Sequence, residues 1–191
     1  MFCYGLVKRV VDVILALFAL LIAFFPAIIL MLIAKIQFGK ALFVQERLGH
    51  KETNFLIYKV KSLGPNHELT PFWIRIRSLG LDEIPQLWNI LKGDLSWVGP
   101  RPLHPEYLQH YTEAQKRRHL VVPGIFGWSQ LHQMQKILTW EERLALDVAY
   151  VEKKSFLFDS QIFIRSVFLL LTKARKNASD FERFGTLERN G

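Results

Sequence analysis

The sequence predicts an α+β fold that is mostly helical, with a re-entrant N-terminal membrane helix in front of a small cytoplasmic domain. One observation is the uncharged run from Val13 to Ala34, long enough to cross a hydrocarbon core of about 30 Å as a helix. Two short strand patterns joined by a polar turn are the second observation, and helical periodicity over much of the remaining chain is the third. We therefore expect a membrane helix over residues 1–38, a cytoplasmic domain over 39–172 and a C-terminal tail over 173–191.

The apolar run has positive charges at both ends and a proline inside. The flanking basic residues are Lys8, Arg9, Lys35 and Lys40. Because an excess of Lys and Arg marks the cytoplasmic side of a membrane segment, both ends are predicted to be cytoplasmic. Pro26 removes a backbone hydrogen bond and kinks a helix. The pattern favours a helix-break-helix that enters and leaves the membrane by one face, and an ordinary bent spanning helix is the alternative.

Composition restricts the class of protein. A chain of 191 residues supports one domain, and its net charge of +8 implies an anionic partner: nucleic acid, phospholipid headgroups or a phosphorylated substrate. The single cysteine, Cys3, excludes an internal disulfide framework and fits a reducing compartment. The sequence has no C-x-x-C, H-E-x-x-H, P-loop or G-x-G-x-x-G motif. Zinc hydrolysis, NTP hydrolysis and dinucleotide redox chemistry therefore lack support.

The segment after the apolar run reads as a β-hairpin. Leu42–Val44 and Phe55–Val60 are predicted strands, and residues 49–51 form a polar turn between them. Residues 64–67 carry the Gly-Pro-Asn signal of a loop. This part of the chain supplies the predicted short β-structure.

Aromatic and basic residues alternate in the next helical segment. Phe72-Trp73-Ile74, with Arg75 and Arg77, suits an amphipathic helix at a headgroup layer. A solvated basic face beside a packed tryptophan explains the same pattern equally well.

Three further helices are predicted towards the C-terminus. Residues 106–119 form the first, and it ends in a basic cluster, 116–119, for which a solvated face is favoured over a lipid contact. Trp140–Lys153 forms the second. Ser155–Thr172 is strongly apolar but contains charged residues, so it reads as an interfacial or core helix and not as a second membrane span.

Two adjacent carboxylates begin a short amphipathic pattern. Asp82 and Glu83 precede apolar residues at helical spacing, Pro85 fits a helix only in its first turn, and Gly93 ends the pattern. The predicted helix start lies close to Asp82, where backbone N–H groups and the helix dipole would favour an ionised carboxylate and attract phosphate. Asp82 is thus a candidate nucleophile for a phosphoryl group, and a plain N-cap is the equally open alternative.

Arginines accompany the acid pair. Arg101 lies between Pro100 and Pro102, which stiffen its backbone, so its guanidinium would lose little entropy on gripping a phosphate. Arg77 is the second candidate phosphate contact. A rigid turn with a surface arginine is the alternative for the Pro-Arg-Pro segment.

These motifs resemble the bacterial sugar transferase family, in particular its small monotopic phosphoglycosyl transferases. The resemblance runs from about Val7 to Thr172 and rests on residues 43–49, 58–62, 82–87, 92–96, 98–102, 118–130 and 147–151. Three positions depart from the family pattern: Phe25 stands where serine commonly precedes the proline, Leu48 where proline is usual, and Phe126 at a hydroxyl position.

The resemblance implies transfer of a sugar-1-phosphate from a UDP-sugar to undecaprenyl phosphate, with release of UMP and with Mg²⁺ as cofactor. Asp82 matches the nucleophile and metal contact, and Glu83 matches the residue that assists the acceptor. The candidate phosphate contacts are Arg77, Arg101, Lys59 and Lys61, and the candidate structural prolines are Pro26, Pro100 and Pro102. The expected location is the bacterial inner membrane, with the catalytic domain on the cytoplasmic face. Membrane phospholipids are expected partners, and nucleic acid is not. The resemblance also allows downstream glycosyltransferases as partners.

Two other interpretations stay open at this point. The same transfer could proceed directly through a ternary complex, with Asp82 as base or metal ligand. A membrane-anchored, basic binding or scaffold protein would share the charge and the aromatic residues. The sequence does not name the sugar: GlcNAc, GalNAc, diacetylated bacillosamine or galactose phosphate all fit.

Overall fold

A computed structural model describes residues 2–64 and 68–173. The predicted C-terminal tail, apart from Lys173, and positions 65–67 of the predicted loop lie outside the described residues. Helices and strands follow in the order α1 (Phe2–Phe38), β1 (Leu42–Leu48), β2 (Asn54–Val60), α2 (Pro71–Ser78), α3 (Gln86–Lys92), β3 (Ser96–Val98), α4 (Glu113–Lys116), β4 (Gly124–Phe126), α5 (Trp128–Gln133), α6 (Trp140–Lys153) and α7 (Phe156–Lys173). The predicted class, mostly helical α+β, is confirmed.

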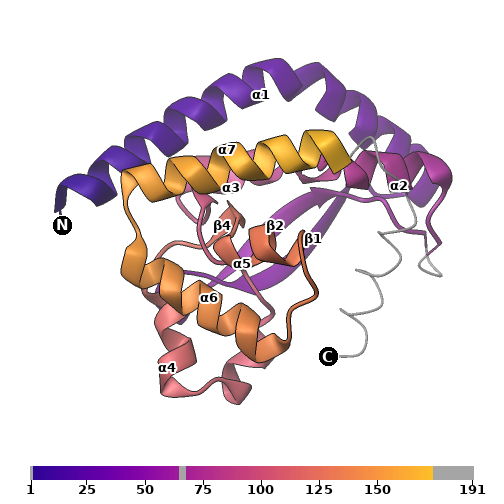
Figure 1. Cartoon of the computed structure of the whole chain (residues 1–191). Helices are drawn as coiled ribbons and strands as arrows, with labels where there is room; N and C mark the ends of the chain where they lie inside the picture. Colours follow the sequence, from indigo (N-terminus) through magenta and orange to yellow (C-terminus); the bar gives the residue numbers. More distant parts are fainter. Residues whose placement is uncertain (1, 65–67, 174–191) are drawn as a thin grey trace.

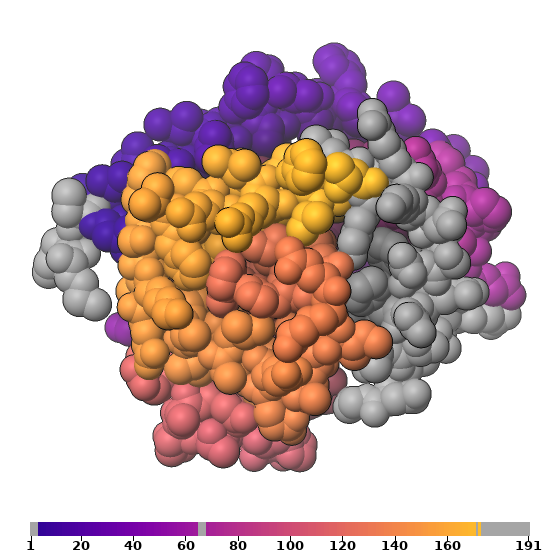
Figure 2. All heavy atoms as spheres, in the orientation of Figure 1, coloured from indigo at the N-terminus to yellow at the C-terminus, as the bar shows by residue number. Residues whose placement is uncertain are grey.

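The apolar run forms one long helix that arches over the rest of the molecule (Figure 1). The helix continues through Pro26, so the predicted break does not interrupt α1. Within the described residues α1 is the one helix long and apolar enough to cross a membrane. Its outer face is exposed and apolar, with Leu21 and Phe25 among the most exposed side chains. On the face of the molecule in Figure 2, α7 lies alongside α1.

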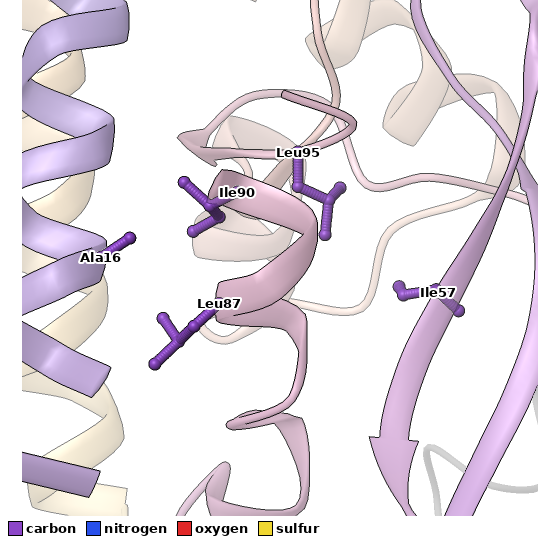
Figure 3. Close-up of a cluster of buried hydrophobic side chains, with 5 residues drawn as sticks. All are labelled: Ala16, Ile57, Leu87, Ile90 and Leu95. Atoms are coloured by element: carbon purple, nitrogen blue, oxygen red, sulfur yellow. The ribbon is translucent and has the colours of Figure 1, made fainter. Parts of the chain in front are cut away.

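The inner face of α1 packs against the folded domain near both of its ends. Ala16 is fully buried against a cluster formed by Ile57 of β2, Leu87 and Ile90 of α3, and Leu95 (Figure 3). The small alanine side chain lets the backbones of α1 and α3 approach closely. This cluster holds α3, the helix that follows the acid pair, against the first half of α1.

The second half of α1 packs on a different cluster. Leu30 and Ala34 contact Val60, Trp73 and Ile76. Trp73 is fully buried in α2, and its indole N–H donates to the side chain of Gln37 at 2.6 Å. The tryptophan of this segment is therefore packed, and the position of α2 at a headgroup layer stays a prediction.

Two small sheets complete the domain. β1 and β2 form the predicted antiparallel hairpin, with Leu42 opposite Val60 and Leu48 opposite Asn54. β3 and β4 form a parallel pair that the sequence analysis did not predict. This pair needs glycine: a Cβ at Gly124 would lie 2.1 Å from the Gly99 nitrogen. The resulting close approach fixes the chain just before the Pro-Arg-Pro segment.

The helix predicted over residues 106–119 is wrong. The chain forms a 3₁₀ turn over Pro105–His110, then α4, then a second 3₁₀ turn over Arg117–Leu120. The interruption comes from Tyr111, which is extended, and from Thr112, which caps α4 through a capping box with Gln115. Local capping therefore divides a segment whose composition suggested one helix.

The last two helices match their predicted ranges closely. α6 begins with a capping box between Thr139 and Glu142, which explains its start at Trp140. α7 buries Asp159 and Ile162 on one face while Leu157 and Phe168 are exposed on the other. α7 is therefore a helix with one packed face and one free apolar face, and it does not qualify as a second membrane span among the described helices.

Candidate functional site

The acid pair lies in a 3₁₀ turn, and the prediction that a helix starts near Asp82 is wrong. The turn covers Leu81–Glu83 and is preceded by Gly80, whose φ of 68° is left-handed. The α-helix begins only at Gln86. Pro85 separates the two, because it has no N–H to donate to the carbonyl one turn earlier. Asp82 therefore stands four residues before the helix, and the argument from the helix dipole does not apply to it.

The two carboxyls of the pair differ in acidity. Burial and the neighbouring charge of Glu83 raise the pKa of Asp82 to about 6, although Lys59 and Arg77 act in the opposite direction. Burial also disfavours the Glu83 anion, but Lys59 and Arg101 outweigh it and lower the pKa of Glu83 to about 2. The expectation that the ionised form is favoured at Asp82 is therefore wrong, because burial and the Glu83 charge raise the pKa of Asp82. The carboxylate whose ionised form is favoured is that of Glu83.

Basic residues from three elements face the pair. The Lys59 ammonium of β2 binds the Glu83 carboxylate at 2.7 Å. Arg101, from the segment after β3, and Arg77, from α2, act on the pair through their charges. Arg77 also donates to the Ser62 hydroxyl at 3.4 Å. The fold therefore brings the predicted acids and three of the four predicted phosphate contacts together.

A small open hollow lies beside Glu83. Its lining residues are Arg47, Ile57, Lys59, Glu83, Gln86, Arg101, Pro102, Gly124 and Ile125. Asp82 is buried and is not among the residues that line this hollow. Arg77 and Lys61 do not line the hollow either. Pro100 is buried, and its carbonyl accepts from the Gly124 nitrogen at 3.0 Å. Its predicted structural role stays a prediction.

Two residues of the hollow were missed by the sequence analysis. Arg47 shares a face of the hairpin with Ile57 and Lys59, and the two-residue strand period could have identified it. Gln86 follows Glu83 by three residues, and its buried side-chain nitrogen has no hydrogen-bond partner within ordinary geometry. Its amide still lies close enough to lower the pKa of Glu83. Both add hydrogen-bond donors to the wall that faces an anionic ligand.

The backbone of Arg101 is held by a buried ion pair. Arg118 is 2% exposed, and its guanidinium donates to the Asp147 carboxylate at 2.8 Å and to the Arg101 carbonyl at 2.6 Å. The second Asp147 oxygen accepts from the Ser129 hydroxyl at 2.6 Å. The prediction of a solvated basic face for residues 116–119 is therefore wrong for Arg118 and for its neighbour His119, which are both buried because partners elsewhere in the chain enclose them.

The residues present fit a hard divalent cation. Among the residues that the structure describes, no cluster of three or more metal-ligating side chains exists. Mg²⁺, however, is commonly bound by one or two carboxylates together with substrate phosphates. Burial and the neighbouring Glu83 charge raise the pKa of Asp82, and a bound cation would offset both effects. Asp82 is therefore a suitable protein ligand, with phosphate oxygens as the others.

An exposed apolar helix lies over a domain in which buried Asp82 and half-buried Glu83 face several cations, an arrangement typical of a membrane-associated protein with an anionic ligand. Residues 3–173 match the model of the family described as Bacterial sugar transferase, and the chain belongs to this family. It is accordingly a transferase.

Curated relatives agree with this assignment. The chain is 38% identical to an uncharacterized sugar transferase, EpsL, of Bacillus subtilis, over 85% of this chain and 86% of that protein. It is 33% identical to a UDP-glucose:undecaprenyl-phosphate glucose-1-phosphate transferase of Caulobacter vibrioides, over 86% of this chain and 70% of that enzyme. It is 30% identical to a UDP-N-acetylgalactosamine-undecaprenyl-phosphate N-acetylgalactosaminephosphotransferase of Aeromonas hydrophila, over 88% of this chain but only 44% of that enzyme.

Proposed function

We propose that this protein transfers a sugar-1-phosphate from a UDP-sugar to undecaprenyl phosphate and releases UMP. The observation that carries the proposal is the pair Asp82 and Glu83, set against Lys59, Arg77 and Arg101 beside an open hollow. This arrangement suits a diphosphate, whose negative charge must be shielded before a carboxylate can attack. The names of the Caulobacter and Aeromonas relatives support the same reaction.

In the proposed mechanism, an Asp82 carboxylate oxygen attacks the β-phosphorus of the UDP-sugar. The bond from that phosphorus to the bridging oxygen breaks, and UMP leaves with the oxygen. A phosphosugar-aspartyl intermediate results. An oxygen of undecaprenyl phosphate then attacks the same phosphorus and restores the Asp82 carboxylate. Asp82 is covered in the structure, so its turn must move towards the hollow when substrate binds.

The remaining residues of the site bind and orient. Lys59 and Arg101 line the hollow with Glu83 and would hold phosphate oxygens there. Glu83, which the cations keep ionised, would orient the incoming acceptor phosphate through a shared cation or hydrogen bond. A Mg²⁺ ion held by Asp82 and by phosphate oxygens would offset the charge of the diphosphate.

Replacement of Asp82 by Asn tests the mechanism. We expect Asp82→Asn to abolish turnover while fold and membrane association persist, because the amide is nearly isosteric but cannot form the acyl phosphate. A UDP-sugar labelled in the sugar should leave label on the wild-type protein and none on Asp82→Asn. Glu83→Gln should still form some adduct but transfer it slowly. Substantial UMP release by Asp82→Asn would exclude Asp82 as the nucleophile.

The same experiment separates the alternatives. UMP release without any trapped label on wild-type protein would favour direct transfer in a ternary complex. Absence of magnesium-dependent UMP release, in a screen that starts with UDP-glucose and UDP-N-acetylgalactosamine, would favour a binding or scaffold protein.

We further propose that α1 is re-entrant, with the domain on the cytoplasmic face of the bacterial inner membrane. Both ends of α1 contact the same domain: Lys8 binds Asp159 at 2.6 Å, and Gln37 accepts from Trp73 at 2.6 Å. Because both ends of α1 are bonded to the same domain, neither end can lie on the opposite side of the membrane from that domain. Basic residues at both ends support the same topology.

Cysteine labelling in sealed vesicles tests this topology. Cys3 is a natural probe near the start of α1, and Lys40→Cys in a Cys3→Ser background probes its far end. Both should react only from the cytoplasmic side, and Pro26→Leu should shift the helix towards a spanning orientation. Labelling of Cys3 from the periplasmic side alone would exclude the re-entrant form.

A further inference from the structure

The first three turns of α1 carry polar side chains whose partners belong to the folded domain. The residues are Tyr4, Lys8, Arg9 and Asp12, and they lie within the helix that is otherwise the most apolar part of the chain. Charged groups in such a segment are expensive unless they are paired. All four are bonded to buried or half-buried groups of three different elements, so the pairing is specific.

Arg9 holds the C-terminal end of α3. Its guanidinium donates to the carbonyls of Ile90 at 2.5 Å and Leu91 at 2.7 Å. The last carbonyls of a helix have no partner within the helix, and a cation there also complements the helix dipole. Gly93, with a left-handed φ of 94°, ends α3 next to this guanidinium. The position of α3 along its axis is thereby tied to α1.

The acid pair lies just before the first residue of α3, at the end opposite to Arg9. α3 has seven residues, and only Ile84 and Pro85 separate Glu83 from its first residue, Gln86. A short helix transmits a shift at one end directly to the other. The contact of Arg9 with residues 90 and 91 therefore fixes the position of Glu83 and Gln86 at the hollow.

Asp12 holds the opposite wall of the site. Its carboxylate accepts from the backbone N–H of Trp97, and its backbone carbonyl accepts from the indole N–H of Trp97, both at 3.2 Å. Trp97 is the central residue of β3, and β3 leads directly into Pro100 and Arg101. Asp12 is buried, so this contact is shielded from water.

Lys8 and Tyr4 provide a third attachment away from the hollow. Both bind the buried Asp159 of α7, at 2.6 Å and 2.7 Å, and Asp159 also accepts from Tyr150 of α6 at 2.8 Å. Lys8 thus joins α1 to the domain without contacting α3 or β3 through a hydrogen bond. It offers a matched control for Arg9, because it carries the same charge one residue earlier.

We infer that Arg9 and Asp12 are positioning residues for the transfer reaction: the membrane helix itself sets the spacing between the acid pair and Arg101. Both walls of the site are attached to a four-residue stretch of α1, one through α3 and the other through β3. This inference rests on the proposed function for its activity readout. The amide exchange readout below does not depend on it.

The test compares Arg9→Gln with Lys8→Gln in the full chain, reconstituted in lipid nanodiscs. We expect Arg9→Gln to lower kcat for UMP release at least tenfold, with the KM for the UDP-sugar within threefold of wild type. Lys8→Gln should change kcat less than threefold. Arg9→Lys can reach only one carbonyl well and should recover part of the loss. Hydrogen exchange of the amides over residues 89–95 should accelerate in Arg9→Gln and stay unchanged in Lys8→Gln.

Equal losses in the two Gln variants would overturn the inference, since they would indicate general anchoring of α1. Unchanged turnover and exchange in Arg9→Gln would overturn it as well. If Arg9→Gln fails to fold, Trp97→Phe removes the indole donor to Asp12 and keeps an aromatic ring beside Phe126 and Phe163. A fall in kcat at constant KM supports the inference, and wild-type kinetics contradict it. If wild-type protein releases no UMP, the proposed function fails, and the exchange comparison still decides whether Arg9 holds α3.

Discussion

The two walls of the hollow are built differently. The arginine wall, residues 100–102, is fixed by two prolines and by the buried Arg118–Asp147 pair, which holds the Arg101 carbonyl. The acid wall is a single 3₁₀ turn between a left-handed glycine and a proline. A buried charge that is fully hydrogen-bonded gives a rigid element, whereas a short turn gives one that can be displaced at low cost.

The difference corresponds to the two tasks of the site. A wall that binds phosphate benefits from preorganised donors. A wall that carries a nucleophile must expose it, and Asp82 is covered in the structure. The raised pKa of Asp82 agrees with a carboxyl that waits for a cation or substrate before it is fully ionised. We conclude that the arginine wall is the fixed reference, that Arg9 holds α3 in place on the acid side, and that only the short turn with Asp82 moves.

Breaking the ion pair of the rigid wall should have the largest effect. Arg118→Met leaves Asp147 buried with only the Ser129 hydroxyl as partner, and we expect a loss of about 3–5 kcal/mol of stability. Thermal unfolding in detergent measures this loss. A loss below about 1 kcal/mol would show that the pair is not shielded from water.

A double variant then separates stability from activity. Arg118→Met with Asp147→Leu removes both charges, which commonly restores most of the stability of a buried pair. The Arg101 carbonyl still lacks its donor, so we expect UMP release to remain low. Recovery of activity together with stability would show that the ion pair supports only the fold.

Arg101→Lys should have the second largest effect. Lysine keeps the charge but replaces a planar, two-pronged donor by a point charge, so we expect about a tenfold to hundredfold loss of kcat/KM with little change in stability. UMP release and thermal unfolding of the same preparation check both parts. Activity near that of wild type would mean that Arg101 contributes only positive potential or shapes the turn.

The smallest effect concerns the acid wall and its pH dependence. Asp82 must be ionised to attack, and its pKa is about 6, so kcat/KM should fall as the pH drops below 6. Arg77 lowers this pKa; Arg77→Gln removes the cation, disfavours the anion and should move the acid limb to higher pH by roughly half a unit. Arg75→Gln, on the same helix but exposed, is the matched control. An equal shift in both variants would contradict a specific action of Arg77 on Asp82.

Much of the architecture was predictable because it depends on local patterns. Strand alternation gave the hairpin, and the capping box at Thr139 marks the start of α6. The site residues Lys59, Glu83 and Arg101 came from motif order and from chemistry, and the fold brings them together. Lys61 is absent from the hollow, and its role in phosphate binding stays a prediction.

What was missed depends on contacts between distant parts of the chain. The parallel pairing of β3 and β4 joins two three-residue strands, which are too short to produce a periodic signal. Arg118 belongs to a basic run that is typical of a surface, and only Asp147, 29 positions later, explains its burial. The late start of α3 has a local cause, because Pro85 has no N–H to continue the helical hydrogen bonds into the turn.

The attachment of α1 to the last described helix has a consequence for biosynthesis. Lys8 and Asp159 are 151 positions apart. At roughly 5–20 residues per second, Lys8 is added to the chain about 8–30 s before its partner. Under the proposed topology its ammonium spends the later part of that interval at the membrane surface, where it helps to keep the end of the helix on the side of synthesis. The same charge therefore first orients the unfinished chain and later joins α1 to α7 in the folded protein.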